Sequence, residues 1–356
     1  MSETAIFPLA TLTAAASVAV LLVAILRLPV RRLVGAQAAY WLWLMVPAGT
    51  LACMLPAPAQ SLRLPEILVP TPIGHALAAA IAAWSGLSAP MFFTNYGSTV
   101  WALGAIAMVW IAVRRQRRFV LSLGRLALLP NGAYRSETAG EPMLVGALRP
   151  RVVVPADFES RYTEEERNFV IAHERAHQQR GDALANALAT GWLCLCWFHP
   201  LMYWAVERFR FDQELACDAT VLQSTRGPRR RYAHALLKTQ LADGAADIVA
   251  SAAPFGAQWQ SAHPLRERIR ALTRPLPGSL RHAAGVVLAL GLIGGGTYST
   301  WAVQVVPKLA SATPASQMPM QAQTVIPQAV PQMVPSHATT VAQRCKGTRT
   351  SSDKVV

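Results

Sequence analysis

Four long stretches without a charged residue dominate the sequence. They cover residues 6–26, 36–55, 96–113 and 283–303. Each is close to the roughly 20 residues that an α-helix needs to cross the hydrocarbon core of a bilayer. Charged residues make up only 15% of the 356-residue chain and hydrophobic residues 53%, whereas about a quarter of an average soluble domain is charged. The sequence therefore predicts a mostly α-helical integral membrane protein with four transmembrane helices.

Arginines beside these stretches predict how the chain is oriented. The basic residues that flank them are Arg27, Arg31, Arg32, Arg114, Arg115, Arg117, Arg118 and Arg281. The segment 56–95 carries only Arg63 as a basic residue. Because cytoplasmic loops are enriched in Lys and Arg, we expect residues 27–35 and 114–282 inside the cell. The N-terminus, the segment 56–95 and the C-terminal tail are then outside, and the apolar but short run 73–87 is expected on the outer surface or against the bundle.

The segment from His173 to His177 has the pattern H-E-x-x-H. Thr163 and Glu166 match the capping box that starts a helix, and neither Gly nor Pro follows before the motif ends. Histidines four residues apart lie on one face of a helix, so both imidazoles can bind a single Zn²⁺. Glu174 then lies beside the metal, where it can act as the general base toward water. The alternative is a surface helix with two solvated histidines.

Residues 184–206 form another uncharged stretch, interrupted at Pro200. A straight helix through it would carry the following residues to the other side of the membrane. Because proline breaks helices, we expect an apolar hairpin of two helices instead. The hairpin brings Glu214 to the histidines as the third ligand of a catalytic zinc. Asp218, one turn later, can then accept a proton from a ligating histidine, although a solvated acidic helix face is the alternative for this pair.

These segments together resemble a known family. The similarity is carried by VGALRPRVVVP (145–155), EEERNFVIAHERAHQQRGDALANAL (164–188) and CWFHPLMYWAVERFRFDQELACDATVL (196–222). They resemble the beta-lactam sensor-transducer metallopeptidases of the BlaR/MecR type. The resemblance implies a multi-pass protein of the bacterial inner membrane. It also implies three leading spans, a cytoplasmic α+β gluzincin-like protease domain at 114–282 and a closing span at 283–303.

The same resemblance implies roles for individual residues. His173, His177 and Glu214 are expected to bind one catalytic zinc, and Glu174 is expected to be the general base. In this family the protease is activated by a signal from outside and then cleaves itself and a cytoplasmic repressor. The implied partner is thus a protein substrate, for which a winged-helix transcriptional repressor is one candidate.

The C-terminal residues depart from the family pattern. Members that sense beta-lactams carry an outer penicillin-binding domain after the last span, whereas residues 304–356 are rich in Pro, Gln, Ala, Ser and Thr. Such a composition predicts a disordered tail outside the cell, which argues against direct beta-lactam binding. His234 and His263 also lie in the predicted protease domain, and either is a candidate to stabilise the oxyanion that forms during peptide hydrolysis.

Two other functions stay open at this point. One is a non-proteolytic membrane signalling module in which zinc only stabilises the inner domain, with Cys217 as a fourth ligand. The other is a housekeeping membrane peptidase that resembles the prenyl-protein peptidases. No DNA-reading motif accompanies the net charge of +14, so contact with anionic membrane lipid is expected rather than direct nucleic-acid binding. The sequence leaves homo-oligomerisation open.

Overall fold

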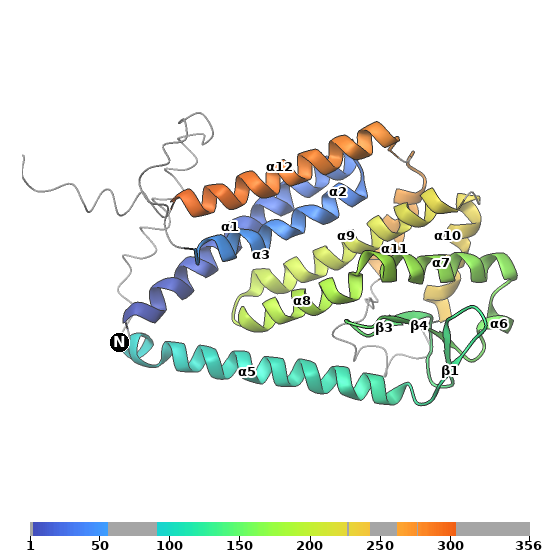
Figure 1. Ribbon diagram of the computed structural model, residues 1–356, viewed down its shortest axis with the longest axis horizontal. Coiled ribbons are helices and arrows are strands. Elements are labelled where there is room, and N and C mark those ends of the chain that lie inside the picture. Colours follow the sequence, from blue (N-terminus) through green and yellow to red (C-terminus); the bar gives the residue numbers. More distant parts are fainter. Residues whose placement is uncertain (1–2, 56–90, 226–227, 243–261, 276, 304–356) are drawn as a thin grey trace, which may run out of the picture. The chain divides into compact units, whose positions relative to one another are not determined.

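The computed structural model describes residues 3–55, 91–225, 228–242, 262–275 and 277–303. The run predicted as a surface helix (73–87) and the predicted tail (304–356) lie outside these residues. Figure 1 shows that helices dominate the described part of the chain. The apolar ones are α1 (Glu3–Leu33), α2 (Ala36–Trp41), the 3₁₀ turn η1 (Leu42–Leu44), α3 (Met45–Ala52), α5 (Met91–Ser122) and α12 (Ser279–Val303). The others are α6 (Phe158–Arg161), α7 (Glu164–Arg180), α8 (Asp182–Leu195), α9 (Pro200–Ser224), α10 (Arg229–Ala242) and α11 (Ala262–Leu272).

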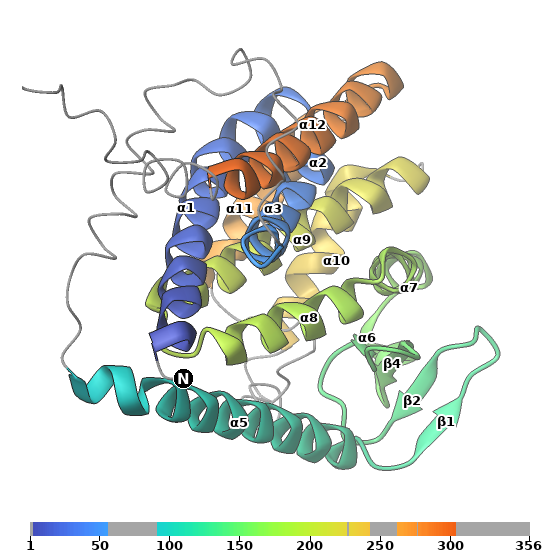
Figure 2. The ribbon, with the colours of Figure 1, turned by 60° about the vertical axis from the view of Figure 1, so that its left-hand side comes forward.

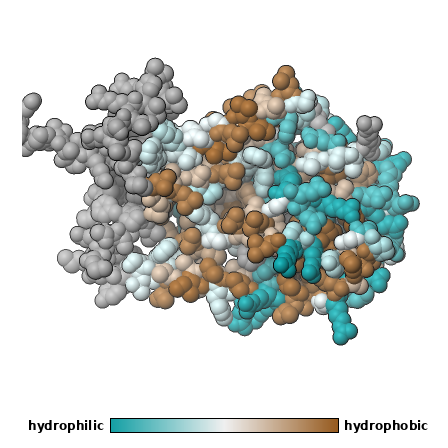
Figure 3. Space-filling model, in the orientation of Figure 1, coloured by the Kyte–Doolittle hydropathy of each residue, from teal (hydrophilic) through white to brown (hydrophobic). Residues whose placement is uncertain are grey.

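Within the described residues, three helices are long and apolar enough to cross a membrane. Their candidate spans are Leu12–Leu33 in α1, Gly97–Ser122 in α5 and Ser279–Trp301 in α12. Large apolar side chains on them, such as Ile25, stay exposed, as expected of surfaces that face lipid. In Figure 3 apolar residues gather over this part of the molecule, whereas hydrophilic residues gather where Figure 1 draws α7 and α10. The second predicted span, 36–55, is divided into α2, η1 and α3, and its crossing stays a prediction.

A small sheet precedes α7, the helix that carries the H-E-x-x-H motif. Its strands are β1 (Leu126–Leu128), β2 (Tyr134–Ser136), β3 (Met143–Val145) and β4 (Arg151–Pro155), in the order β1-β2-β4-β3. The pair β2–β4 is parallel, and the two outer pairs are antiparallel. Side chains alternate between the faces of a strand. Val154 of β4 therefore packs with Val170 and Ile171 of α7, whereas Val153 packs with Phe119 of α5. A mostly helical chain with a small sheet agrees with the fold class expected from the sequence.

Helices α8 and α9 form an antiparallel pair that starts directly after α7. Gly181 has φ of 71°, the left-handed conformation that suits glycine, and it both ends α7 and precedes α8. The chain turns between α8 and α9, and Pro200 occupies the first position of α9, where its missing N–H costs no helical hydrogen bond. Figures 1 and 2 both draw α9 running beside α8 and back toward α7. This path brings the second half of α9 against α7.

A buried carboxylate ties α9 to the apolar helices. Asp212 of α9 is 1% exposed, and its Oδ2 atom lies 3.2 Å from Nη1 of Arg27 in α1. The indole N–H of Trp43 donates a hydrogen bond to the same oxygen at 2.9 Å. A buried charge is tolerated only where it is paired and hydrogen-bonded. These contacts therefore hold α9 in one position against α1 and η1, two residues before Glu214.

The capping box predicted for α7 is present. The Thr163 side chain accepts from the backbone N–H of Glu166, and the Glu166 carboxylate accepts from the backbone N–H of Thr163. Lys238 and His234 of α10 also contact this carboxylate, at 2.8 and 3.0 Å. Burial alone would raise the pKa of Glu166, but the hydrogen bonds from Lys238, from the Thr163 backbone and from His234 lower this pKa to about 2. The cap thus fixes the start of α7 and joins it to α10.

The lowered pKa predicts how stability depends on pH. The ordinary pKa of the carboxyl is 4.5, so its stabilising contribution is fully present above that pH and is lost as the pH falls toward 2. Glu166→Gln should lower the free energy of unfolding by about 2 kcal/mol at pH 7. The difference in unfolding free energy between wild type and Glu166→Gln should shrink as the pH falls below 4.5. Thermal unfolding of the detergent-solubilised chain measures this difference. Glu164→Gln, an exposed change in the same turn, is the control. Equal losses for both variants, or a pH-independent difference, would contradict this prediction.

Candidate metal centre

Three side chains predicted to bind metal converge between α7 and α9. The Nε2 atoms of His173 and His177 lie 3.1 Å apart. One carboxylate oxygen of Glu214 lies 3.4 Å from Nε2 of His173, and the other lies 3.4 Å from Nε2 of His177. Ligand atoms of a tetrahedral zinc, with bonds of about 2.0–2.1 Å, are roughly 3.3 Å apart. This donor set therefore fits one Zn²⁺.

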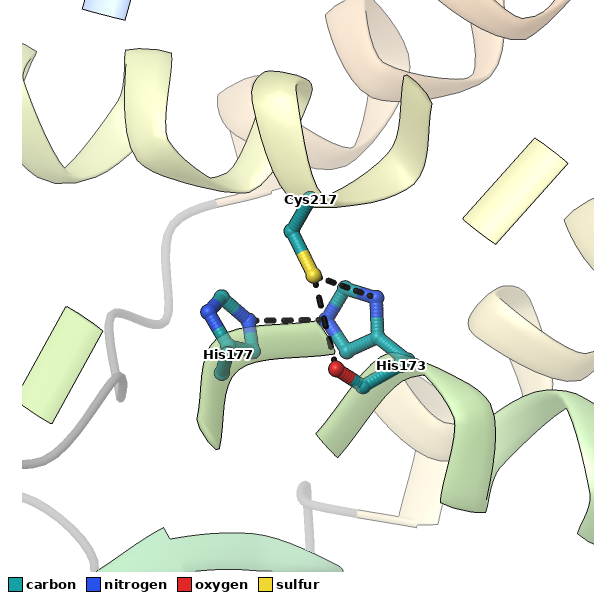
Figure 4. A group of neighbouring side chains, drawn as sticks. All are labelled: His173, His177 and Cys217. Atoms are coloured by element: carbon teal, nitrogen blue, oxygen red, sulfur yellow. Dashed lines mark hydrogen bonds between the residues drawn. The ribbon is translucent and has the colours of Figure 1, made fainter. Parts of the chain in front are cut away.

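The local structure of each helix explains this convergence. His173 and His177 are four residues apart on α7, so their rings point from the same face, as Figure 4 shows. The rings meet edge to face, with centroids 4.7 Å apart. His173 is 8% exposed and His177 1% exposed. Glu214 comes from the part of α9 that the turn at Pro200 returns to α7, and its side chain is 17% exposed.

Each histidine has a second partner that orients its ring. Nδ1 of His177 lies 2.7 Å from Oδ2 of Asp182, the first residue of α8. A carboxylate can only accept here, so Nδ1 carries the proton and Nε2 keeps its lone pair for a metal. Nδ1 of His173 lies 2.9 Å from the hydroxyl of Tyr232, which donates to Oδ1 of Asp218 at 2.7 Å. The Tyr232 oxygen therefore accepts the proton of His173, which leaves Nε2 of that ring available in the same way.

Asp218 thus lies behind His173, and Tyr232 stands between them. Oδ1 of Asp218 is 3.5 Å from Nδ1 of His173, too far for a good hydrogen bond. The guanidinium of Arg268, on α11, donates to both Asp218 oxygens at 2.8 and 2.9 Å. It also lies 3.0 Å from Oε2 of Glu214. Arg268 is 8% exposed, so one buried cation holds two carboxylates of α9, Asp218 and Glu214.

The electrostatics of this cluster favour a cation between the donors. Burial would lower the pKa of His173, but negative charge on the Cys217 sulfur and on the Glu214 carboxylate raises it to about 10. Burial likewise would lower the pKa of His177, yet Cys217, Glu214 and Asp182 hold it well above its usual range. Burial would raise the pKa of Glu214, but Arg268 and the imidazoles hold it well below its usual range. These groups together stabilise positive charge at the point where the donors meet.

Glu174 lies next to the donors on the same helix. It is 8% exposed. Burial raises the pKa of its carboxyl, and the imidazoles of His173 and His177 oppose this change. A carboxyl with a raised pKa is a stronger base once it is ionised. Glu174 lies between the two histidines in the sequence, the position that the H-E-x-x-H pattern predicts for a general base.

Cys217 offers a different third donor. Its Sγ atom lies 3.5 Å from Nδ1 of His173, and it donates to the backbone oxygen of His173 at 3.4 Å. One donor atom each from His173, His177 and Cys217 lie within 4.8 Å of one another (Figure 4). The Sγ atom contacts Nδ1 of His173, which also pairs with Tyr232. The Glu214 carboxylate instead faces the two Nε2 atoms, so the structure offers both Glu214 and Cys217 as a third donor.

His234, one of the two histidines considered as oxyanion stabilisers, is not part of this cluster. His234 pairs with Glu166 at 3.0 Å at the first turn of α7, and its side chain is 68% exposed. The side chain of His263 lies outside the described residues. Three residues of the site were not predicted: Asp182, Tyr232 and Arg268. Asp182 follows the motif by five residues, which is a usable signal. Tyr232 and Arg268 lie on α10 and α11, and their partners on α7 and α9 are decided by how these helices pack.

Comparison with known proteins shows the family to which the chain belongs. Residues 8–272 match the model of a family described as BlaR1 peptidase M56. The chain is also 30% identical, over 90 residues, to Regulatory protein BlaR1 of Bacillus licheniformis. That alignment covers 25% of this chain and 15% of the relative. Since the family model matches well over half of the sequence and includes both α7 and α9, the chain belongs to the BlaR1 peptidase M56 family.

Proposed function

We propose that this protein is an integral membrane zinc endopeptidase of the gluzincin type that transmits a signal by regulated proteolysis. The observation that carries the proposal is the 3.1–3.4 Å spacing of the donor atoms of His173, His177 and Glu214. Membership of a peptidase family supports it independently. The candidate spans in α1, α5 and α12 support a location in the membrane.

In the proposed mechanism the protein residues hold the metal and move a proton. His173, His177 and Glu214 hold the zinc, with Asp182 and Tyr232 fixing the two imidazole orientations. When bound, the zinc supplies Lewis-acid polarisation of the scissile carbonyl and of the attacking water. Glu174 takes a proton from this water as general base and returns it to the leaving amine as general acid.

The proposed topology follows the charge pattern. Residues 6–26, 36–55, 96–113 and 283–303 cross the bacterial inner membrane, and residues 114–282 are cytoplasmic. The arginines next to these stretches support this orientation. A cytoplasmic site suits a cytoplasmic substrate, so we propose a winged-helix repressor or the chain itself as the protein that is cut. The matching relative is named a regulatory protein, which supports a regulatory substrate for this chain.

New protein N-termini test the proposed activity in cells. Cells that carry the wild-type chain and cells that carry Glu174→Gln are grown with and without cell-wall stress, and their N-termini are compared. Termini that depend on Glu174 would establish proteolysis and identify the substrate. Dependence on stress would support regulation, whereas constant cleavage would indicate a housekeeping peptidase like the prenyl-protein peptidases. Identical termini under all conditions would contradict proteolysis.

A second candidate function is a signalling module in which zinc is purely structural. It is favoured by the cluster of His173, His177 and Cys217, because closed structural zinc sites often contain thiolates. In our proposal, Cys217→Ser should keep one zinc per purified chain. Glu214→Gln should weaken zinc binding by at least about 100-fold. Loss of a residue that only orients a ligand lowers metal affinity roughly 10–100-fold, and loss of a ligand itself should lower it more. Metal content and chelator competition are measured for both variants. Loss of zinc from Cys217→Ser, with zinc retained by Glu214→Gln, would favour the structural role.

A further inference from the structure

Tyr40 connects an apolar membrane segment to the metal centre. It lies on α2, at the start of the apolar stretch 36–55, and its ring stacks on Phe209 of α9 with centroids 5.5 Å apart. Its hydroxyl donates a hydrogen bond to Oδ1 of Asp182 at 3.2 Å. The guanidinium of Arg180 lies over the same ring, 4.7 Å from its centre. The ring is thus packed from two sides, and its hydroxyl points at Asp182.

Asp182 is shared between Tyr40 and His177. Its other oxygen, Oδ2, lies 2.7 Å from Nδ1 of His177, and both side chains are 1% exposed. A carboxylate so buried has no water to replace a lost partner, so its position depends on the donors around it. Arg180 is a further donor, 3.3 Å from Oδ2. Tyr40 is the donor to Asp182 that comes from the membrane segment.

The Tyr40 hydroxyl also contacts the helix that carries Glu214. Nε2 of Gln213 donates to this hydroxyl at 3.3 Å, and Oε1 of Gln213 accepts from Asn186 at 3.0 Å. Gln213 is fully buried and directly precedes Glu214. Asp212, the residue before it, is held by Arg27 and Trp43. One hydroxyl therefore bridges the partner of His177 and the turn of α9 that presents Glu214.

We propose that Tyr40 is a positioning residue for the metal centre, which makes the affinity for zinc depend on how α2 packs against α9. The inference rests on the proposed function in one respect, because it takes His173, His177 and Glu214 as the ligands. Its physical basis is that Tyr40 helps to hold Asp182, and Asp182 orients His177. A shift of α2 would release Asp182 and loosen two of the three ligands together. The membrane segment and the metal centre are then energetically coupled.

Tyr40→Phe tests this coupling with little change in packing. The variant keeps the ring that stacks on Phe209 and beneath Arg180, and it removes only the hydroxyl. Tyr203→Phe is the matched control, because Tyr203 lies in the first turn of α9, well before Gln213, and its hydroxyl donates to the backbone oxygen of Trp197 at 2.8 Å. Zinc affinity of the full-length chain in detergent is measured by chelator competition, and Co²⁺ substitution reports the ligand geometry by absorption. Thermal unfolding without metal reports folding.

We expect Tyr40→Phe to weaken zinc binding about tenfold, in the range known for outer-shell partners, and to alter the Co²⁺ spectrum. Tyr203→Phe should bind zinc like wild type. In an Asp182→Asn background, Tyr40→Phe should have a smaller effect, because only the contact of Tyr40 with Gln213 then remains to be lost. Unchanged affinity in Tyr40→Phe, or an effect of the same size in both backgrounds, would overturn the inference. If the wild-type chain itself binds no zinc, the proposed function fails; if wild type binds zinc and Tyr40→Phe matches it, this inference alone fails.

Discussion

Glu174→Gln is expected to lower the rate of peptide cleavage by about 10³-fold, within the range known for loss of a general base, and to leave zinc bound. Glutamine has nearly the same shape but cannot take a proton from water, so the donors His173, His177 and Glu214 keep their 3.1–3.4 Å spacing. The purified chain is assayed on the peptide bond identified in cells, and its zinc content is measured in the same preparation. Retained metal together with lost turnover would assign Glu174 to the chemistry rather than to the fold.

Two controls make this result specific. Glu164→Gln changes an exposed carboxylate at the start of the same helix, and it should leave the rate within about twofold, as surface changes usually do. Glu174→Asp keeps a carboxylate but withdraws it by one methylene, so its rate should fall between those of wild type and Glu174→Gln. Undiminished cleavage by Glu174→Gln would reject the proposed mechanism. Loss of zinc from that variant would instead assign Glu174 a role in holding the metal.

Arg268→Met is expected to cost about 3–5 kcal/mol of stability when the metal has been removed, as is typical when one partner of a buried ion pair is lost. Arg268 is 8% exposed and contacts Asp218 at 2.8 Å and Glu214 at 3.0 Å. Without it, both carboxylates remain buried with one cation fewer. Zinc at the site would compensate the charge of Glu214, so the loss should be smaller in the zinc-loaded chain.

Thermal unfolding in the presence of zinc and in the presence of a chelator measures the stability of the zinc-loaded and of the metal-free chain. Arg270→Met is the matched control, because Arg270 is an exposed arginine on the same helix. It should change stability by no more than about 0.5 kcal/mol. If Arg268→Met behaved like Arg270→Met without metal, the ion pairs of α11 with α9 would not be needed to hold Glu214. If its loss were equal with and without zinc, the coupling between Arg268 and the metal would be rejected.

The local features of this protein were predictable from its sequence because they depend on neighbours in the chain. The capping box of Thr163 and Glu166 is present, since both hydrogen bonds form within one helical turn. Histidines four apart on α7 had to share a face. Length and composition alone make α1, α5 and α12 candidate membrane spans. The stretch 36–55 has similar composition, yet it forms α2, η1 and α3, and contacts with other helices rather than composition set these boundaries.

The environment of the ligands depended on tertiary structure. Asp218 was expected to contact a ligating histidine directly, but the hydroxyl of Tyr232 from α10 lies between Asp218 and His173. His177 is paired with Asp182 instead. His234, a candidate near the reaction on sequence grounds, pairs with Glu166 at the start of α7. Spacing along the chain gives a signal only for the pairing of His177 with Asp182, because the other partners are far apart in the sequence and lie on different helices.

The sequence by itself determined the helical membrane segments, the capped helix α7 and the pair His173 and His177, because hydrophobic length, capping and helical periodicity act locally. The break at Pro200 already predicted that Glu214 comes close to this pair. Only the tertiary structure decided the other groups around it: Tyr232 and Arg268 come from α10 and α11, and Tyr40 reaches Asp182 because α2 packs on α9. Such contacts follow from how helices bury their side chains against one another, and this depends on the whole chain rather than on any one segment.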